Sequence, residues 1–127
     1  MIKNIPNKYT QETLLQEFSV NHDNTIDFFY LPIDKDNECN VGYAFLNFIN
    51  TSYIKSFFKE FHGKRWRKYN SAKICNLCYA RYQGTLELAN HFRHTKIFQQ
   101  KDRKLRPLIG DALKDIEEMI KNQRRKE

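Results

Sequence analysis

The stretch that decides the fold is Val41-Gly42-Tyr43-Ala44-Phe45-Leu46-Asn47-Phe48. It predicts a β-strand with two different faces, because side chains point to opposite sides along a strand. One face carries the apolar residues at 44, 46 and 48, and the other carries the rings of Tyr43 and Phe45. A strand that already buries one apolar face in the core does not need aromatic side chains on its opposite face. The paired rings therefore predict a surface on which flat groups, such as the bases of single-stranded RNA, can stack.

The octamer resembles the signature of an RNA recognition motif, Lys/Arg-Gly-Phe/Tyr-Gly/Ala-Phe-Val-x-Phe/Tyr. Every position fits except the first, where Val41 replaces the basic residue, with Leu46 allowed for Val. Residues 1–5 resemble the last five positions of the second signature, a hexamer on the first strand, with Met1 at its aromatic position. Because the chain begins inside this hexamer, we expect either a fragment of a longer protein or a gene trimmed to this start.

The resemblance implies an α+β fold of the ferredoxin-like βαββαβ type, with a four-stranded antiparallel sheet and two helices on one face. Hydrophobic patterning gives the same order, with strands near residues 1–5, 26–33, 41–48 and 74–82. We expect residues 1–94 to form this domain, including a short extra helix over 85–92. Residues 95–127 are expected to form a C-terminal extension that contains a helix at about 111–126.

Composition indicates a small basic domain. The chain has 127 residues, a net charge of +7 and three cysteines, an odd number that gives no disulfide framework. Without a secretory signal or a long apolar run, we expect an intracellular protein of the nucleus, the cytoplasm or both, with no membrane partner. Residues 62–100 contain eight Lys and Arg but one Glu. Such a segment favours phosphate backbones, although a solvated basic face is an equally good interpretation.

Several collinear stretches resemble the C-terminal RNA recognition motif of the Mei-two-like proteins more specifically. They are residues 1–10, 27–34, 40–45, 61–64 with Trp66, and 79–81 with 83–84. The similarity covers roughly residues 1–107. Members of that family are RNA-binding regulators of meiosis and development. The resemblance implies the fold of an RNA recognition motif and RNA binding, but it does not by itself assign a biological role. Together with the paired rings, it predicts single-stranded RNA as the partner, post-transcriptional regulation as the function and no enzymatic activity.

The strand alternation and the basic loop predict which residues contact RNA. If Asp27 faces water, Phe29 lies on the open face of the sheet, although a place in the core is equally possible for it. The loop before the fourth strand should supply charge to the RNA backbone. The predicted RNA-binding residues are Met1, Lys3, Phe29, Tyr43, Phe45, Asn47, Lys64, Arg65, Arg67, Lys68, Arg81 and Tyr82.

A metal site is considered and rejected. Cys75 and Cys78 are followed by His91 and His94 at nearly the spacing of a zinc finger. Only two residues separate the histidines, however, and positions 75 and 78 of a strand point to opposite faces. We therefore expect no metal, and the chain carries no motif for a cofactor or for catalysis.

The alternative function is binding of a protein. One class of RNA recognition motif holds a peptide ligand through Arg-x-Phe before the fourth strand and through its helical face, and Lys64 and Trp66 stand in those places here. The helix at 111–126 has an apolar side with Leu113 and Ile120. We expect it to dock on or beside the open sheet face as a lid, to clamp RNA with its basic end, or to bind a protein partner.

Overall fold

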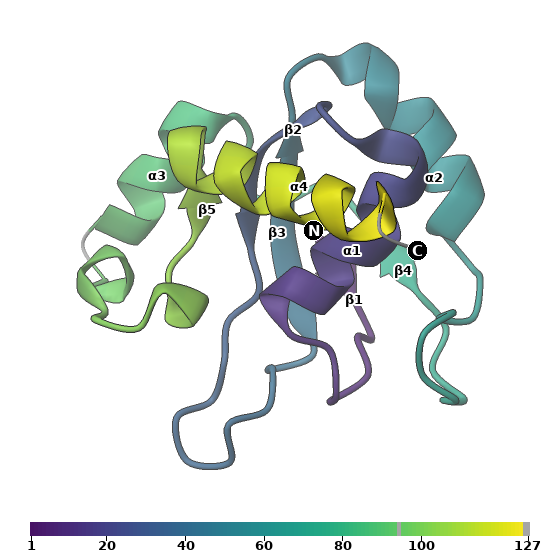
Figure 1. Cartoon of the computed structure of the whole chain (residues 1–127), viewed down its shortest axis with the longest axis horizontal. Helices are drawn as coiled ribbons and strands as arrows, with labels where there is room; N and C mark the ends of the chain where they lie inside the picture. The colour runs from purple at the N-terminus through teal and green to yellow at the C-terminus, as the bar shows by residue number, and fades with distance from the viewer. Residues whose placement is uncertain (94, 126–127) are drawn as a thin grey trace.

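Over residues 1–93 and 95–125, which the computed structural model describes, the chain forms a five-stranded antiparallel sheet (Figure 1). The order across it is β4-β1-β3-β2-β5, so the octamer strand is central. The first four strands and the helices between them follow the predicted βαββαβ order. The fifth strand was not predicted. The strands are β1 (Ile2–Lys3), β2 (Ile26–Tyr30), β3 (Tyr43–Phe48), β4 (Asn76–Leu77) and β5 (Leu108–Ile109).

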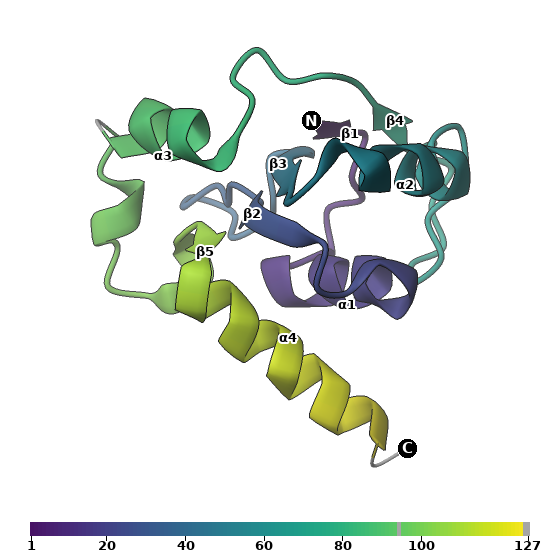
Figure 2. The ribbon, with the colours of Figure 1, turned by 90° about the horizontal axis from the view of Figure 1, so that it is seen from above.

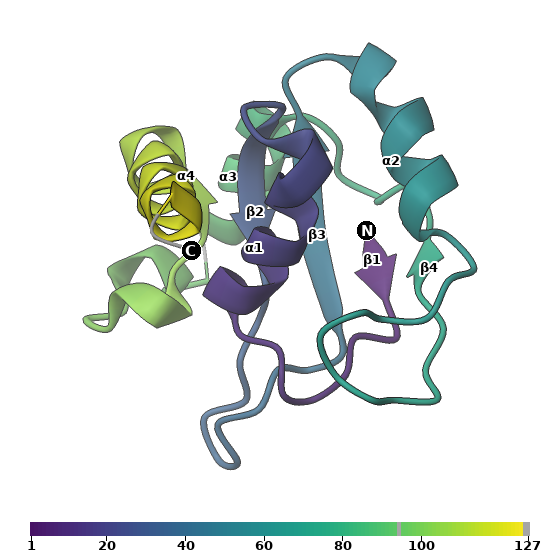
Figure 3. The same cartoon turned by 45° about the vertical axis from the view of Figure 1, so that its right-hand side comes forward.

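Helices α1 (Gln11–His22) and α2 (Ile54–Phe61) cover one face of the sheet, and α1 lies across β2 and β3 (Figure 3). Thr10 caps α1, because its hydroxyl accepts the Thr13 amide and the Thr13 hydroxyl accepts the Thr10 amide. The short 3₁₀ helix η1 (Thr51–Tyr53) leads into α2. Between helices and sheet lies the main core, where the Phe18 ring packs edge-on against two rings of α2.

The two faces of β3 are as the octamer predicts. Ala44 is fully buried under the helices, whereas Tyr43 on the opposite face is 38% exposed. The fourth strand is shorter than expected. It ends at Leu77, and Tyr79, which lies inside the predicted strand 74–82, is 77% exposed.

Helix α3 (Thr85–Arg93) packs on the other face of the sheet, over β2. Its Leu88 and Phe92 form a second buried cluster with Phe28 and Tyr30. Two 3₁₀ helices, η2 (Ile97–Gln99) and η3 (Arg103–Leu105), follow it. The expectation of a fully open face is therefore wrong, since α3 covers the β2 side.

Helix α4 (Gly110–Arg125) lies beside α1 on the helix-covered face, and Figure 2 shows α3 and α4 on opposite sides of the β2–β5 edge. Its Leu113 and Ile120 belong to the main core. The expectation that this helix docks on the open face is wrong. The reason is that the apolar side of α4 packs in the main core beside α1, after a turn from β5 at which Gly110 has a φ of +54°. No helix in the described part of the chain is long and apolar enough to span a membrane.

Candidate nucleic-acid interface

A row of exposed side chains crosses the uncovered half of the sheet. Lys3 of β1 is paired with Tyr43 on one side and with Asn76 on the other, so the three residues are neighbours across the strands. All three are exposed, and Met1, the residue before β1, is half-buried. A flat phenol ring thus lies next to an ammonium group and an amide on a surface that the helices leave free.

A second row begins at Phe45, which is paired with Tyr30. The Phe45 ring is half-buried because Phe92 of α3 packs against it at 5.2 Å between centroids, while Tyr43 lies 5.8 Å away on its other side. Burial raises the pKa of Tyr30, with a contribution from Tyr43, so its phenol stays neutral. Phe45 therefore links the exposed row to the covered part of the sheet.

The rings continue beyond the sheet along α3. His91 lies 4.7 Å from Phe92 and stacks on Tyr82 at 4.0 Å with an interplanar angle of 19°. The guanidinium carbon of Arg81 lies 5.7 Å from the Tyr82 ring centroid. The structure therefore places the predicted residues Arg81 and Tyr82 at the border of the sheet face. The rings of His91 and Phe92, which connect them to the sheet, are not among the predicted RNA-binding residues.

Asn47 has a different place from the one expected. Its side chain donates to the Asp27 carboxylate at 2.9 Å, and its Oδ1 accepts the Gly84 amide at 3.1 Å. It also lies 3.4 Å from the Thr85 hydroxyl. The predicted contact of Asn47 with a base remains untested, but this amide is already engaged in fixing the start of α3 to the sheet.

Phe29 is not on the open face, and that prediction is wrong. Its side chain is fully buried in the main core, whereas Phe28 and Tyr30 point to the side of α3. The cause is a shift of the pairing register between Ile26 and Phe28, typical of a β-bulge. An inserted residue reverses the alternation beyond it, so the position of Asp27 does not predict that of Phe29.

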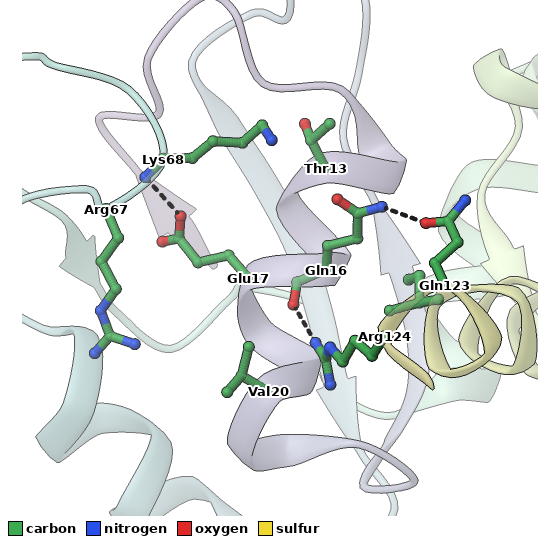
Figure 4. A pocket seen from close by; sticks show the side chains of 9 residues that line it. Thr13, Gln16, Glu17, Val20, Arg67, Lys68, Gln123 and Arg124 are labelled. Carbon is green, nitrogen blue, oxygen red and sulfur yellow. Dashed lines mark hydrogen bonds between the residues drawn. The ribbon is translucent and has the colours of Figure 1, made fainter. Parts of the chain in front are cut away.

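The basic loop between α2 and β4 is divided between two sides of the molecule. Lys64 and Arg65 are exposed beside β4, where position 65 forms a bridge with Ile74. Arg67 donates to Glu60 at 2.7 Å. With Lys68 it lines a groove of about 370 Å³ between α1 and α4 (Figure 4). The structure does not bring Arg67 and Lys68 to the exposed row of the sheet.

Trp66, in the same loop, is a core residue. It is 5% exposed, its Nε1 donates to the Asn4 carbonyl at 2.8 Å, and its ring packs against Tyr9 and Phe18. The alternative function requires an accessible aromatic side chain at this position. The burial of Trp66 therefore argues against a peptide site at Lys64–Trp66.

The cysteines and histidines considered for zinc are separated. Cys75 is buried, and burial together with the nearby Glu17 raises the pKa of its thiol to about 12, while Cys78 is exposed. His91 stacks on Tyr82, and His94 lies outside the described residues. Among the residues that are described, no three His, Cys, Asp or Glu side chains gather in a group that could hold a metal ion.

Comparison with known proteins gives the family. The model of RNA recognition motif 2 matches residues 1–93. The chain belongs to this family. It is therefore an RNA-binding domain rather than an enzyme.

The resemblance to the Mei-two-like proteins is also confirmed. The chain is 52% identical over 111 residues to Protein MEI2-like 5 of Oryza sativa subsp. japonica, covering 87% of this chain and 14% of the relative. It is 50% identical over 109 residues to Protein MEI2-like 2 of the same plant, covering 86% of this chain and 13% of the relative. Protein MEI2-like 5 of Arabidopsis thaliana is 47% identical over 112 residues, with 88% and 14% covered. The chain spans about one-seventh of these relatives.

Proposed function

We propose that this domain binds single-stranded RNA across the exposed row of Asn76, Lys3 and Tyr43. One observation carries the proposal. The Tyr43 ring is 38% exposed on the sheet surface and is directly paired with Lys3. A base can stack on the ring while the ammonium group meets the adjoining phosphate. Regulation of transcripts after transcription is the role that such binding would serve.

The geometry favours unpaired bases for a physical reason. A base within a duplex already stacks on its neighbours, so only an unstacked base can lie flat on Tyr43. Phe45 offers less of its ring, because Phe92 covers one side. The domain should therefore prefer single strands to duplexes, and Tyr43 should contribute more than Phe45.

A substitution of Tyr43 tests this proposal. Tyr43→Ala should lose about 1–3 kcal/mol of binding free energy, a five- to 150-fold loss of affinity for single-stranded RNA. Fluorescence anisotropy with RNAs selected from a random pool measures it. Tyr53→Ala is the matched control, because Tyr53 is also 38% exposed but belongs to η1. Unchanged RNA affinity in a folded Tyr43→Ala variant would refute the proposal.

The phosphate contact proposed for Lys3, the cation in the exposed row, can be tested separately. Lys3→Gln should make the slope of log affinity against log salt shallower by about 0.7, the value for one lost phosphate contact on a single strand. Lys55→Gln, which removes an exposed lysine of α2, should leave the slope unchanged. An equal effect of both substitutions would mean that net charge alone is responsible.

A further inference from the structure

The chain after α3 carries an unusual concentration of positive charge. Residues 93–106 contain six Lys and Arg and a single acid, Asp102. That carboxylate caps η3 by accepting the Lys104 amide at 3.0 Å. Among the described residues, no carboxylate lies within salt-bridge distance of the exposed cations of this segment, which are Arg93, Lys96, Lys101, Arg103 and Lys104.

The segment is nevertheless held in a fixed conformation. The guanidinium of Arg106 points inward and donates to the carbonyls of Gln100 and Lys101 at 2.6 and 3.0 Å. From the other side, the Gln11 amide donates to the carbonyls of Lys104 and Arg106 at 3.2 and 2.7 Å. The backbone is thus tied to its own loop and to α1, while the charged side chains remain exposed. Fixing like charges near one another lowers the entropy cost of binding a polyanion.

The first part of the basic segment lies next to the sheet face, at the edge formed by β2 and α3. Ile97 and Phe98 of η2 pack against the cluster of Phe28, Tyr30 and Phe92. The η2 part of the segment therefore borders the sheet face on the β2 side, and residues 104–106 lie at the start of α1. Lys64 and Arg65 lie on the β4 side. Rings connect Tyr43 to Phe92 through Phe45, so the exposed row and the basic segment adjoin the same aromatic cluster, whose Phe28, Tyr30 and Phe92 are buried.

We propose that residues 95–106, together with Arg93, are a second anchor for the phosphate backbone of the same RNA strand. This inference rests on the proposed function and extends it beyond residues 1–93, where the family match ends. RNA is favoured over a membrane or an acidic protein because the large apolar side chains here, Ile97, Phe98 and Leu105, are half-buried. Phosphate contacts need charge without an apolar surface, and this segment offers that combination.

A charge-removal variant tests the anchor. Lys96, Lys101, Arg103 and Lys104 are changed together to Gln, and the matched control changes Lys55, Lys59, Lys114 and Lys121, four exposed lysines of α2 and α4. Affinity is measured for single-stranded RNAs of about 4 and about 12 nucleotides, lengths within the range of site sizes known for OB folds that bind single strands. A third variant, with Lys96, Lys101 and Lys104 changed to Arg, keeps the charge.

The anchor variant should bind the 12-nucleotide RNA about tenfold or more weakly, with a salt slope shallower by up to about 3. It should bind the 4-nucleotide RNA normally, and the Arg variant should match the unchanged chain. Equal losses in the anchor and control variants, or no loss in either, would overturn the inference. Tyr43→Ala should lower the affinity for both RNAs. If only the anchor variant loses affinity, the proposed stacking on Tyr43 fails while the anchor stands.

Discussion

Gln11 is the residue on which three segments meet. It is a buried polar side chain at the first position of α1. Its Nε2 donates to the carbonyls of Lys104 and Arg106, and its Oε1 accepts the amide of Leu31 at 2.9 Å. One side chain thus joins the first helix, the end of β2 and the basic segment. Removing it would leave backbone groups unpaired where water has little access.

Gln11→Ala should therefore lower the free energy of unfolding by about 1–3 kcal/mol, measured by chemical denaturation. Gln16→Ala on the same helix is the control. The Gln16 side chain makes one exposed hydrogen bond, to Gln123, so its loss should cost less than about 0.5 kcal/mol. Equal effects of the two substitutions would contradict the role given to Gln11.

Glu60 makes stability depend on pH. Burial raises the pKa of this carboxyl, but hydrogen bonds from His22, Arg67 and Asn21 outweigh burial, so the pKa lies below the ordinary value of 4.5. A carboxyl whose pKa is lowered in the folded protein makes its full contribution to the stability of the folded state when the pH is above its unfolded pKa. It loses that contribution as pH falls through the folded value.

The free energy of unfolding should thus decline more steeply between about pH 5 and 3 in the unchanged protein than in Glu60→Gln. Denaturant titrations across this range measure the decline. Glu118→Gln, at an exposed position of α4, should keep the original pH profile. Parallel curves for the unchanged protein and Glu60→Gln would show that the ion pair between Glu60 and Arg67 does not form.

Among the elements, α3 is the one that decides how much of the sheet is accessible. Leu88 and Phe92 attach it to β2, and Asn47 fixes its start. Phe92→Ala removes a ring worth about 3–5 kcal/mol in a core, which is enough to open a short helix locally. Amide hydrogen exchange should therefore become fast in α3 while α1 stays protected. Leu86→Ala, at a position 72% exposed on the same helix, should leave the exchange of α3 unchanged.

Local sequence patterns predicted the helices and strands. Contacts between residues far apart in the sequence decided how these elements pack on one another. The alternation of residues 41–48 was enough to assign the faces of Ala44 and Tyr43, because it depends on neighbours along one strand. Phe29 was misplaced because a bulge leaves no clear trace in a run of apolar residues. The apolar stripe of α4 was visible, but its partner, α1, is almost a hundred positions away and no local rule selects it.

At the scale of the whole molecule, the C-terminal segment completes the fold. Leu108, Leu113 and Ile120 are part of the main core, and β5 pairs with β2. Burial of each such side chain stabilises by about 1.5–3 kcal/mol. Their combined contribution is comparable with the total stability of a small domain, about 5–15 kcal/mol.

A chain cut after Arg106 should therefore be largely unfolded, as measured by circular dichroism and thermal denaturation. A chain cut after Gln123 keeps Ile120 and should remain folded. It loses the bonds from Arg124 to the carbonyls of Gln16 and Ser19 and should melt only a few degrees lower. Cooperative unfolding of the shorter chain at an unchanged temperature would contradict this role of α4.

The two outer strands have a consequence for how these domains behave when crowded together. The border strands β4 and β5 have two residues each. Unpaired backbone groups along a long, flat border recruit strands from other molecules, and very short border strands are one way in which natural proteins prevent it. Copies of this domain that lie close together therefore offer each other little exposed strand edge, and their sheets should not join into aggregates.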